Sequence, residues 1–142
     1  MNELQKNIAS LFEVNPEDLK TISAFFHPIQ VNKGEYFLQS GAYANRMGFI
    51  QSGIMRELVN LPDKEVTKWI ATPGYFVTDL SSFLFNEPAK STLQALTPCE
   101  LYVISKEDYN NLGKVVSSWN TVEKLFLAKC FATMSERILT FI

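Results

Sequence analysis

The side chains that most often carry out chemistry in proteins are sparse in this sequence. His27 is the only histidine in 142 residues, and the two cysteines, Cys99 and Cys130, each lie in an apolar run. A cupin-type metal site needs several imidazoles, and a catalytic triad needs a base beside its nucleophile. His27 also stands directly before Pro28, which is typical of the end of a helix. We therefore expect no metal site, no catalytic residue and no enzymatic activity.

The segment DLSSFLFNEP, residues 79–88, is the clearest irregularity among the patterns of the chain. It lacks the alternation of a strand and opens with Asp79 before two serines, which predicts a single helical turn. An aspartate at the N-cap accepts hydrogen bonds from free backbone amides of such a turn. Asp79 is therefore a candidate cap.

Short strand-like runs surround this turn, between residues 29 and 105. Turn-forming residues separate the runs, and Gly34, Gly41, Gly53 and Gly74 all fall at such punctuating positions. The runs are IQVN, EYFL, RMGFIQSGIMRELV, EVTKWIAT, STLQAL and ELYVIS. This spacing is typical of a sandwich or barrel, and a roll of antiparallel hairpins is the most economical assembly.

Helical periodicity marks both ends of the chain. Residues 2–26 predict two amphipathic helices, with Asn15 as the cap and Pro16 as the first residue of the second. The sequence SKEDYNNLG predicts a short helix that Ser105 caps and Gly113 ends. Residues 115–142 contain neither Gly nor Pro, and a helix of this length would span about 42 Å.

The last predicted helix carries an apolar seam with alternating spacings of four and three residues. Its members are Leu127, Phe131, Met134, Ile138 and Phe141. Such spacing is typical of two supercoiled helices, although the seam of a shorter helix could pack on the protein's own roll. Because the helix is long for a domain of this size, we expect a homodimer. The run also ends on ERILTFI without a cap, so we expect the chain to be part of a longer protein.

Composition narrows the remaining classes. There are 13 basic and 15 acidic residues, a net charge of −2, which does not favour direct binding of nucleic acid. Hydrophobic residues make up 46% of the chain, enough for the core of one domain, and no apolar stretch approaches the 18 residues of a membrane span. With few cysteines and no signal peptide, the sequence predicts a cytoplasmic protein.

The order of these elements resembles the effector domain of Crp/Fnr-type bacterial transcription regulators. VNKGEYFLQSGAYANRMGFIQSGIMREL is similar to the family's opening, and TPGYFVTDLSSFLFNEPAKSTLQALTPCELYVISKEDYNNL to its phosphate-binding segment and closing strands. The resemblance implies a mainly β fold with flanking helices. Residues 1–114 would form a double-stranded β-helix, a jelly roll of the cyclic nucleotide-binding type, and residues 115–142 a long dimerisation helix. DNA would be bound only through a winged helix-turn-helix that this chain lacks.

The resemblance also implies a ligand site. In nucleotide-binding relatives the short helix presents backbone amides to a cyclic phosphate, an arginine pairs with the phosphate, and an acid holds the ribose hydroxyl. Asp79 matches the acid, as a ligand contact, as the cap, or as both. Thr78 stands in the place of a family glycine and Ala89 in the place of the arginine, so the arginine is missing. Lys90 either turns inward as a substitute or stays in solvent. The full candidate set is Thr78, Asp79, Leu80, Ser81, Ser82, Ala89, Lys90 and Ser91.

Taken together, the resemblance implies an allosteric sensor that controls transcription as a homodimer. Its effector would be a cyclic nucleotide or another small anion, although cAMP is not expected to bind in the usual way without the arginine. Two alternatives remain open at this point. One is a dimerisation or regulatory module without a ligand, and the other is a cupin-like enzyme.

Overall fold

Two four-stranded antiparallel sheets form the central part of the chain. The computed structural model describes the backbone of residues 2–12 and 14–140 and the side chains of residues 2–10 and 14–137. The chain divides into two compact units, Phe25–Tyr109 and Met1–Ala24 together with Asn110–Ile142. The two compact units do not test the predicted domain boundary after residue 114, which separates the roll from a dimerisation helix. That boundary stays a prediction.

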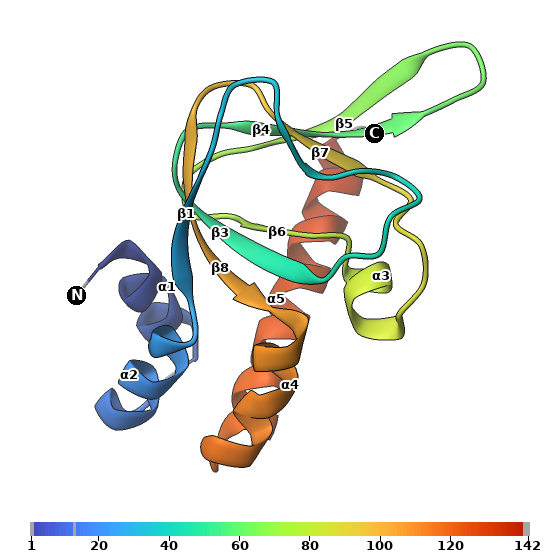
Figure 1. Cartoon of the computed structure of the whole chain (residues 1–142). Coiled ribbons are helices and arrows are strands. Elements are labelled where there is room, and N and C mark those ends of the chain that lie inside the picture. Colours follow the sequence, from blue (N-terminus) through green and yellow to red (C-terminus); the bar gives the residue numbers. More distant parts are fainter. Residues whose placement is uncertain (1, 13, 141–142) are drawn as a thin grey trace. The chain divides into compact units, whose positions relative to one another are not determined.

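The first unit is a roll of eight strands (Figure 1). Sheet A has the spatial order β1 (His27–Val31), β8 (Cys99–Ser105), β3 (Arg46–Ser52) and β6 (Phe76–Val77). Sheet B has the order β2 (Tyr36–Leu38), β7 (Thr92–Ala95), β4 (Met55–Asn60) and β5 (Glu65–Ala71). Neighbouring strands in both sheets run antiparallel. The predicted fold class, a mainly β roll with flanking helices, is confirmed.

Gly53 passes the chain from sheet A to sheet B. The run RMGFIQSGIMRELV is therefore two strands, β3 and β4, which belong to different sheets. Gly53 has a φ of +87°, and a Cβ at this position would lie 2.8 Å from the Sγ atom of Cys99 and still closer to the carbonyl oxygen of Pro98. Only glycine fits both the backbone conformation and the space.

The core of this unit is mostly apolar. Its fully buried large side chains come from both sheets and from the short helix α3 (Leu80–Phe85), and burying each contributes about 1.5–3 kcal/mol. They are Phe49, Ile50, Met55, Leu58, Phe83, Leu93, Leu101 and Ile104.

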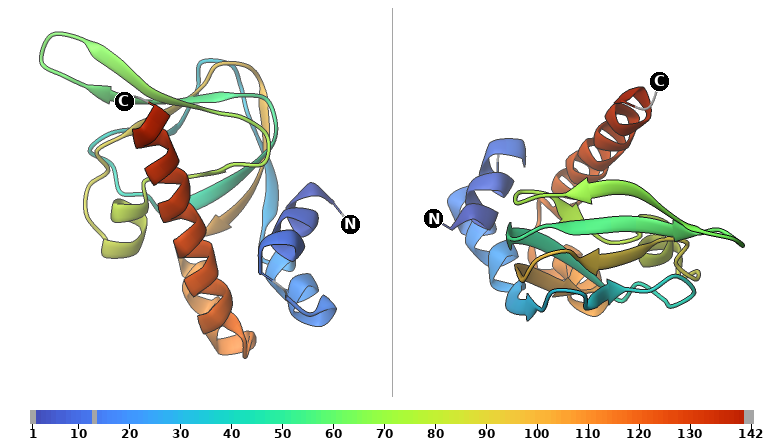
Figure 2. Two further views of the ribbon diagram at one scale, coloured as in Figure 1. Left: turned by 180° about the vertical axis from the view of Figure 1, so that it is seen from behind. Right: turned by 90° about the horizontal axis from the view of Figure 1, so that it is seen from above.

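Strand β5 is one of the two edge strands of sheet B, and most of its side chains are exposed. With β4 it forms a hairpin that projects beyond the two sheets (Figure 2). The pairing shifts within this hairpin, since Glu57 lies opposite Trp69 while the next residue, Leu58, lies opposite Thr67. Lys68 is therefore an extra residue in β5, which is the definition of a β-bulge.

The second unit is helical. Helices α1 (Glu3–Phe12) and α2 (Pro16–Ala24) confirm the predicted helix pair, but α2 ends at Ala24, and His27, expected at the end of a helix, begins strand β1 instead. The Oδ1 atom of Asn15 accepts a hydrogen bond of 2.8 Å from the amide of Asp18. The carboxylate of Asp18 also accepts a 2.7 Å hydrogen bond from the hydroxyl of Ser118. Asn15 is thus the predicted cap.

Two predicted boundaries near the C-terminal end are wrong. Helix α4 (Lys106–Val115) is capped by Ser105 as predicted, through a 3.1 Å bond to the amide of Asp108, but it continues past Gly113. The long helix α5 (Trp119–Thr140) begins at residue 119 rather than 115. Val116, Ser117 and Ser118 lie between the two helices, and the hydroxyl of Ser118 donates to Asp18 rather than to the backbone of either helix. Strand β6, two residues long, was also not predicted.

Candidate functional site

Asp79 holds the start of helix α3 in the roll. Its backbone is extended, with φ −97° and ψ 104°, and its Oδ1 atom accepts a hydrogen bond of 3.2 Å from the amide of Ser82. The helix ends at Asn86, whose left-handed φ of 54° lets its amide bond to the carbonyl oxygen of Ser82. Asp79 is therefore the N-cap, and that part of the prediction is confirmed.

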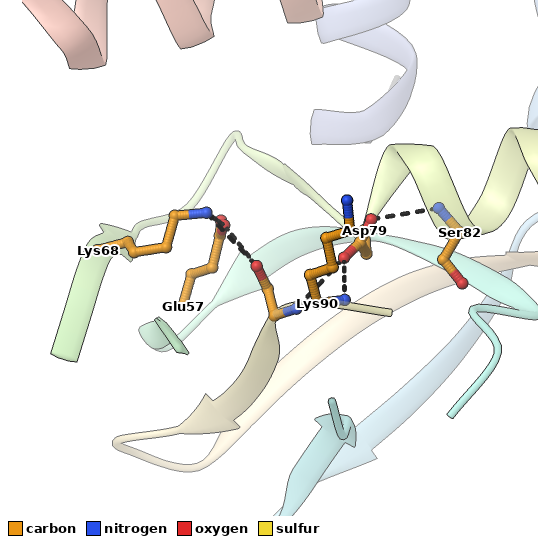
Figure 3. Close-up of polar contacts among 6 residues, drawn as sticks. Glu57, Lys68, Asp79, Ser82 and Lys90 are labelled. Carbon is orange, nitrogen blue, oxygen red and sulfur yellow. Dashed lines mark hydrogen bonds and ion pairs between the residues drawn. The ribbon is translucent and has the colours of Figure 1, made fainter. Parts of the chain in front are cut away.

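The second carboxylate oxygen of Asp79 binds a different segment of the chain. Its Oδ2 atom accepts hydrogen bonds from the amides of Lys90 at 2.9 Å and Ser91 at 3.3 Å (Figure 3). One carboxylate thus joins the start of α3 to the residues that lead into β7. Hydrogen bonds to a charged group are about twice as strong as neutral ones, so this link holds residues 79–91 as one closed loop.

The other predicted site residues lie in the same neighbourhood, and several are engaged with the protein itself. The hydroxyl of Thr78 donates a 3.1 Å bond to the carbonyl of Arg46, and the buried hydroxyl of Ser82 accepts a 2.8 Å bond from the amide of Ala44. Leu80 is half-buried, while Ser81 is exposed. The hydroxyls of Thr78 and Ser82 therefore serve the fold in this structure.

The position that resembles the family's arginine is occupied by a small apolar side chain. Ala89 is buried, and its backbone pairs with the loop that follows β2, through a 2.7 Å bond to the carbonyl of Ala42 and a 2.8 Å bond from the amide of Gly41. Lys90 is exposed, and it reaches Asp79 through its backbone amide. The segment thus presents amides rather than a guanidinium.

Two charged residues beside this segment were not predicted. Lys68 in β5 lies with its Nζ atom 3.1 Å from the Oε2 atom of Glu57 in β4 and 3.4 Å from the hydroxyl oxygen of Ser91 (Figure 3). The Ser91 hydroxyl also donates a 3.3 Å bond to Glu57. The sequence carries no signal for this cluster, because the alternation of β5 places Lys68 on the other face and only the bulge brings it back.

Glu57 belongs to the apolar face of sheet B. It stands two residues from Met55 and directly opposite Leu93, both of which are fully buried, and side chains at such positions share one face. The Glu57 side chain is 17% exposed. A largely buried carboxylate on an apolar face is costly unless a cation and hydrogen-bond donors hold it, and Lys68 and Ser91 are such partners of Glu57.

A separate open hollow of about 440 Å³ lies at the surface of the roll near β2 and the start of β3. Its lining includes Tyr36 and Tyr43, both exposed, and Arg46. The guanidinium of Arg46 lies 4.2 Å above the ring of Phe37 and donates a 3.1 Å bond to the Phe37 carbonyl, and burial lowers its pKa. Arg46 therefore holds β2 in place.

Helix α5 contains the predicted dimer seam. Phe131 is 72% exposed and Met134 is 51% exposed, while Leu127 is half-buried. Leu125, on the same helix, is also exposed. The side chain of Ile138 and the whole of Phe141 lie outside the described residues. The surface of α5 thus presents large apolar side chains to solvent.

Neither a membrane span nor a metal cluster is found among the described residues. No helix within them is long and apolar enough to cross a bilayer. No group of three or more histidine, cysteine, aspartate or glutamate side chains gathers there as metal ligands.

Comparison with known proteins gives a family and a fold. The family model described as the cyclic nucleotide-binding domain matches residues 28–114. No curated protein matches this chain. A cyclic nucleotide-binding domain from Methylobacillus flagellatus KT superimposes with a TM-score of 0.83 at 16% identity, over 95% of this chain and 78% of that one.

Two transcription regulators are similar in structure. The N-terminal domain of a transcriptional regulator from Streptomyces coelicolor A3(2) has a TM-score of 0.76 at 20% identity, over 96% of both chains. The catabolite activator protein of Thermus thermophilus has a TM-score of 0.77 at 19% identity, over 95% of this chain and 61% of that one. The chain therefore spans about three fifths of that regulator. These findings confirm the resemblance inferred from the sequence.

Proposed function

Because the chain belongs to the cyclic nucleotide-binding domain family, we propose that it is the effector-sensing and dimerising part of a bacterial Crp/Fnr-type transcription regulator. The observation that carries this proposal is the family match across residues 28–114, which covers nearly the whole roll. Regulation by such a domain needs an effector that binds one arrangement of the protein better than another. The proposed site of action is the cytoplasm, and both cysteines are free thiols.

In this proposal DNA is bound by a different part of the regulator. The net charge of −2 gives the chain no surplus of cations with which to neutralise phosphates. Structural neighbours include regulators longer than this chain. A winged helix-turn-helix outside these residues would therefore contact DNA, and this domain would control its placement.

The proposal further holds that cAMP does not bind in the manner implied by the resemblance. The buried Ala89 offers no charge, and the carboxylate of Asp79 already takes the amides of Lys90 and Ser91. A phosphate would therefore find no guanidinium here, and the amides of Lys90 and Ser91 are already bonded to Asp79. They equally support the alternative of a regulatory module that needs no ligand.

Thermal melting in the presence of cAMP, cGMP and, as a control, 5′-AMP tests this part. A ligand at about 100 times its dissociation constant stabilises the folded state by roughly 2.7 kcal/mol, or on the order of 10 °C for a chain of this size. We expect no shift with either cyclic nucleotide beyond that with 5′-AMP. A shift of several degrees specific to a cyclic nucleotide would contradict the proposal.

The dimer is proposed from the surface of α5. Phe131 and Met134 are large, apolar and mostly exposed on one helix, and their spacing suits a supercoiled partner. A second copy of the same helix would bury both side chains. Light scattering coupled to size exclusion should report twice the mass of 16.1 kDa, and a monomer at high micromolar concentration would overturn this part.

A further inference from the structure

The charged cluster on the apolar face of sheet B carries an inference beyond the predicted site. We propose that Lys68 is the cation that holds an anionic effector in this domain, and that Glu57 is a built-in competitor that occupies Lys68 until the effector binds. The effector class is a small molecule that carries a phosphate or a carboxylate. The inference rests on the proposed function, because it names the cation of the same sensing site.

The backbone places Lys68 in the cluster by an irregular route. In a regular strand Lys68 would point away from the face that carries Trp69 and its partner Glu57. The bulge inserts Lys68 as an extra residue, and its Nζ atom then lies 3.1 Å from Glu57. A bulge costs ladder hydrogen bonds and typically re-aims one side chain. The side chain re-aimed here is a cation.

The groups that meet at this point match the needs of an anion. The ammonium of Lys68 and the hydroxyl of Ser91 both donate to the Oε2 atom of Glu57, at 3.1 Å and 3.3 Å. A phosphate or carboxylate oxygen in that position would receive the same two donors. Asp79 fixes Ser91 by accepting its amide at 3.3 Å, so it acts as a positioning residue.

Exposure makes exchange of the two anions possible. The Lys68 side chain is 48% exposed while that of Glu57 is 17% exposed, so solvent reaches the ammonium more readily than the carboxylate. An incoming anion must compete with Glu57 and also bear its repulsion at close range. Removing that one charge should tighten anion binding about tenfold or more.

The test uses the full chain and three variants in thermal melts against inorganic phosphate and, separately, succinate. Sodium chloride at matched ionic strength is the reference for both anions. Glu57→Gln should melt several degrees higher with at least one anion, at a concentration about tenfold lower than wild type requires. The anion that gives the larger shift identifies the group in the effector.

Two double variants assign the effect to one lysine. Adding Lys68→Met to Glu57→Gln should abolish the shift, whereas adding Lys64→Met should preserve it. Lys64 is an exposed residue in the same hairpin, and the Lys64→Met substitution removes the same charge as Lys68→Met. The melt without added anion shows that each variant folds.

The inference is overturned if Glu57→Gln responds to neither anion more than wild type does, or if its response survives Lys68→Met. These outcomes are separate from those of the proposed function. If the chain is a dimer and its Glu57→Gln variant shows no added response to either anion, only this inference is overturned. If the chain is a monomer that binds an anion through Lys68, only the proposed dimerising role is overturned.

Discussion

Phe83 and Phe131 lie on helices of the two units and differ widely in burial. Phe83 is 1% exposed on the six-residue helix α3, where its ring meets that of Tyr109 edge to face at 5.1 Å. Phe131 is 72% exposed on the 22-residue helix α5. A phenylalanine side chain is thus part of the buried core in α3 and part of the exposed surface in α5.

The contacts described for the two helices also differ. The short helix α3 is held at its start by Asp79, which also ties down the segment before β7. Helix α5 exposes Leu125 and Met134 as well as Phe131. A six-residue helix cannot persist by itself, so the roll supplies its contacts. A long helix can persist with an apolar surface, and that surface is what a second chain would cover.

The largest expected effect is on the buried phenylalanine. Phe83→Ala should lower the free energy of unfolding by about 3–5 kcal/mol, because a large cavity replaces a ring packed on all sides. Phe131→Ala, measured at a concentration where the chain is monomeric, should change it by less than about 0.5 kcal/mol. Urea denaturation of both variants measures the pair of values. Equal losses in the two variants would mean that α5 is covered within a single chain, which breaks the comparison.

The second prediction concerns association rather than folding. Phe131→Gln should weaken dimerisation about tenfold to a hundredfold, since an apolar anchor is replaced by a polar side chain at a desolvated seam. Lys129→Gln is the matched control, because two helical positions place it on nearly the opposite side of α5 from Phe131. Sedimentation equilibrium of the three proteins gives the dissociation constants. Equal weakening by the two substitutions would place the interface elsewhere.

Local rules predicted much of the roll from the sequence. Asn15, Asp79 and Ser105 were each identified as helix caps from residue type and position, and each accepts the expected amide. Caps are readable because the chemistry lies within three residues. The strand-like runs were readable for a similar reason, since alternation and turn residues act locally.

Features that depend on contacts between distant parts of the chain could not be predicted from the sequence. The bulge at Lys68 is set by how β5 pairs with β4, and no residue type in EVTKWIAT marks it. The break at Ser117 and Ser118 was missed because neither Gly nor Pro is present, while Ser118 bonds to Asp18, far away in sequence. The cluster of Glu57, Lys68 and Ser91 needs three separate segments, so only the folded chain shows it.

A third, smaller effect tests how the roll closes residues 79–91. Asp79→Ala removes the acceptor of three backbone amides, and loss of such a cap should cost about 1–2 kcal/mol in the free energy of unfolding. Asp79→Asn keeps one acceptor oxygen, so its free energy of unfolding should lie between those of Asp79→Ala and wild type. Hydrogen exchange at Lys90 and Ser91 should quicken in both variants. Unchanged exchange there would show that other contacts close this loop.

Asp63→Ala is the control for the change of charge. Asp63 is exposed in the loop between β4 and β5, so its removal alters the net charge by the same amount. We expect its unfolding free energy to stay within about 0.5 kcal/mol of wild type.

The last prediction concerns the thiol pKa values of the cysteines in the two units. It has the smallest expected effect on stability, because the free energy of unfolding at neutral pH does not change. Burial raises the pKa of the Cys130 thiol from 9.0 to about 11, against an opposing attraction from Arg137, and burial also raises the pKa of Cys99 in the roll. A raised thiol pKa favours the folded, protonated form, so its contribution is complete below about pH 9 and is lost as the pH rises toward 11. At pH 8 a shift of two pKa units leaves about a hundredfold less thiolate, so alkylation of Cys130 by iodoacetamide should be about a hundredfold slower than in urea-unfolded chain. Mass spectrometry of the peptide with Cys130 follows the rate. If Cys130 reacts as fast in the folded chain as in the unfolded one, its part of α5 opens readily, and the exposed surface of that helix reflects fraying rather than a seam awaiting a partner.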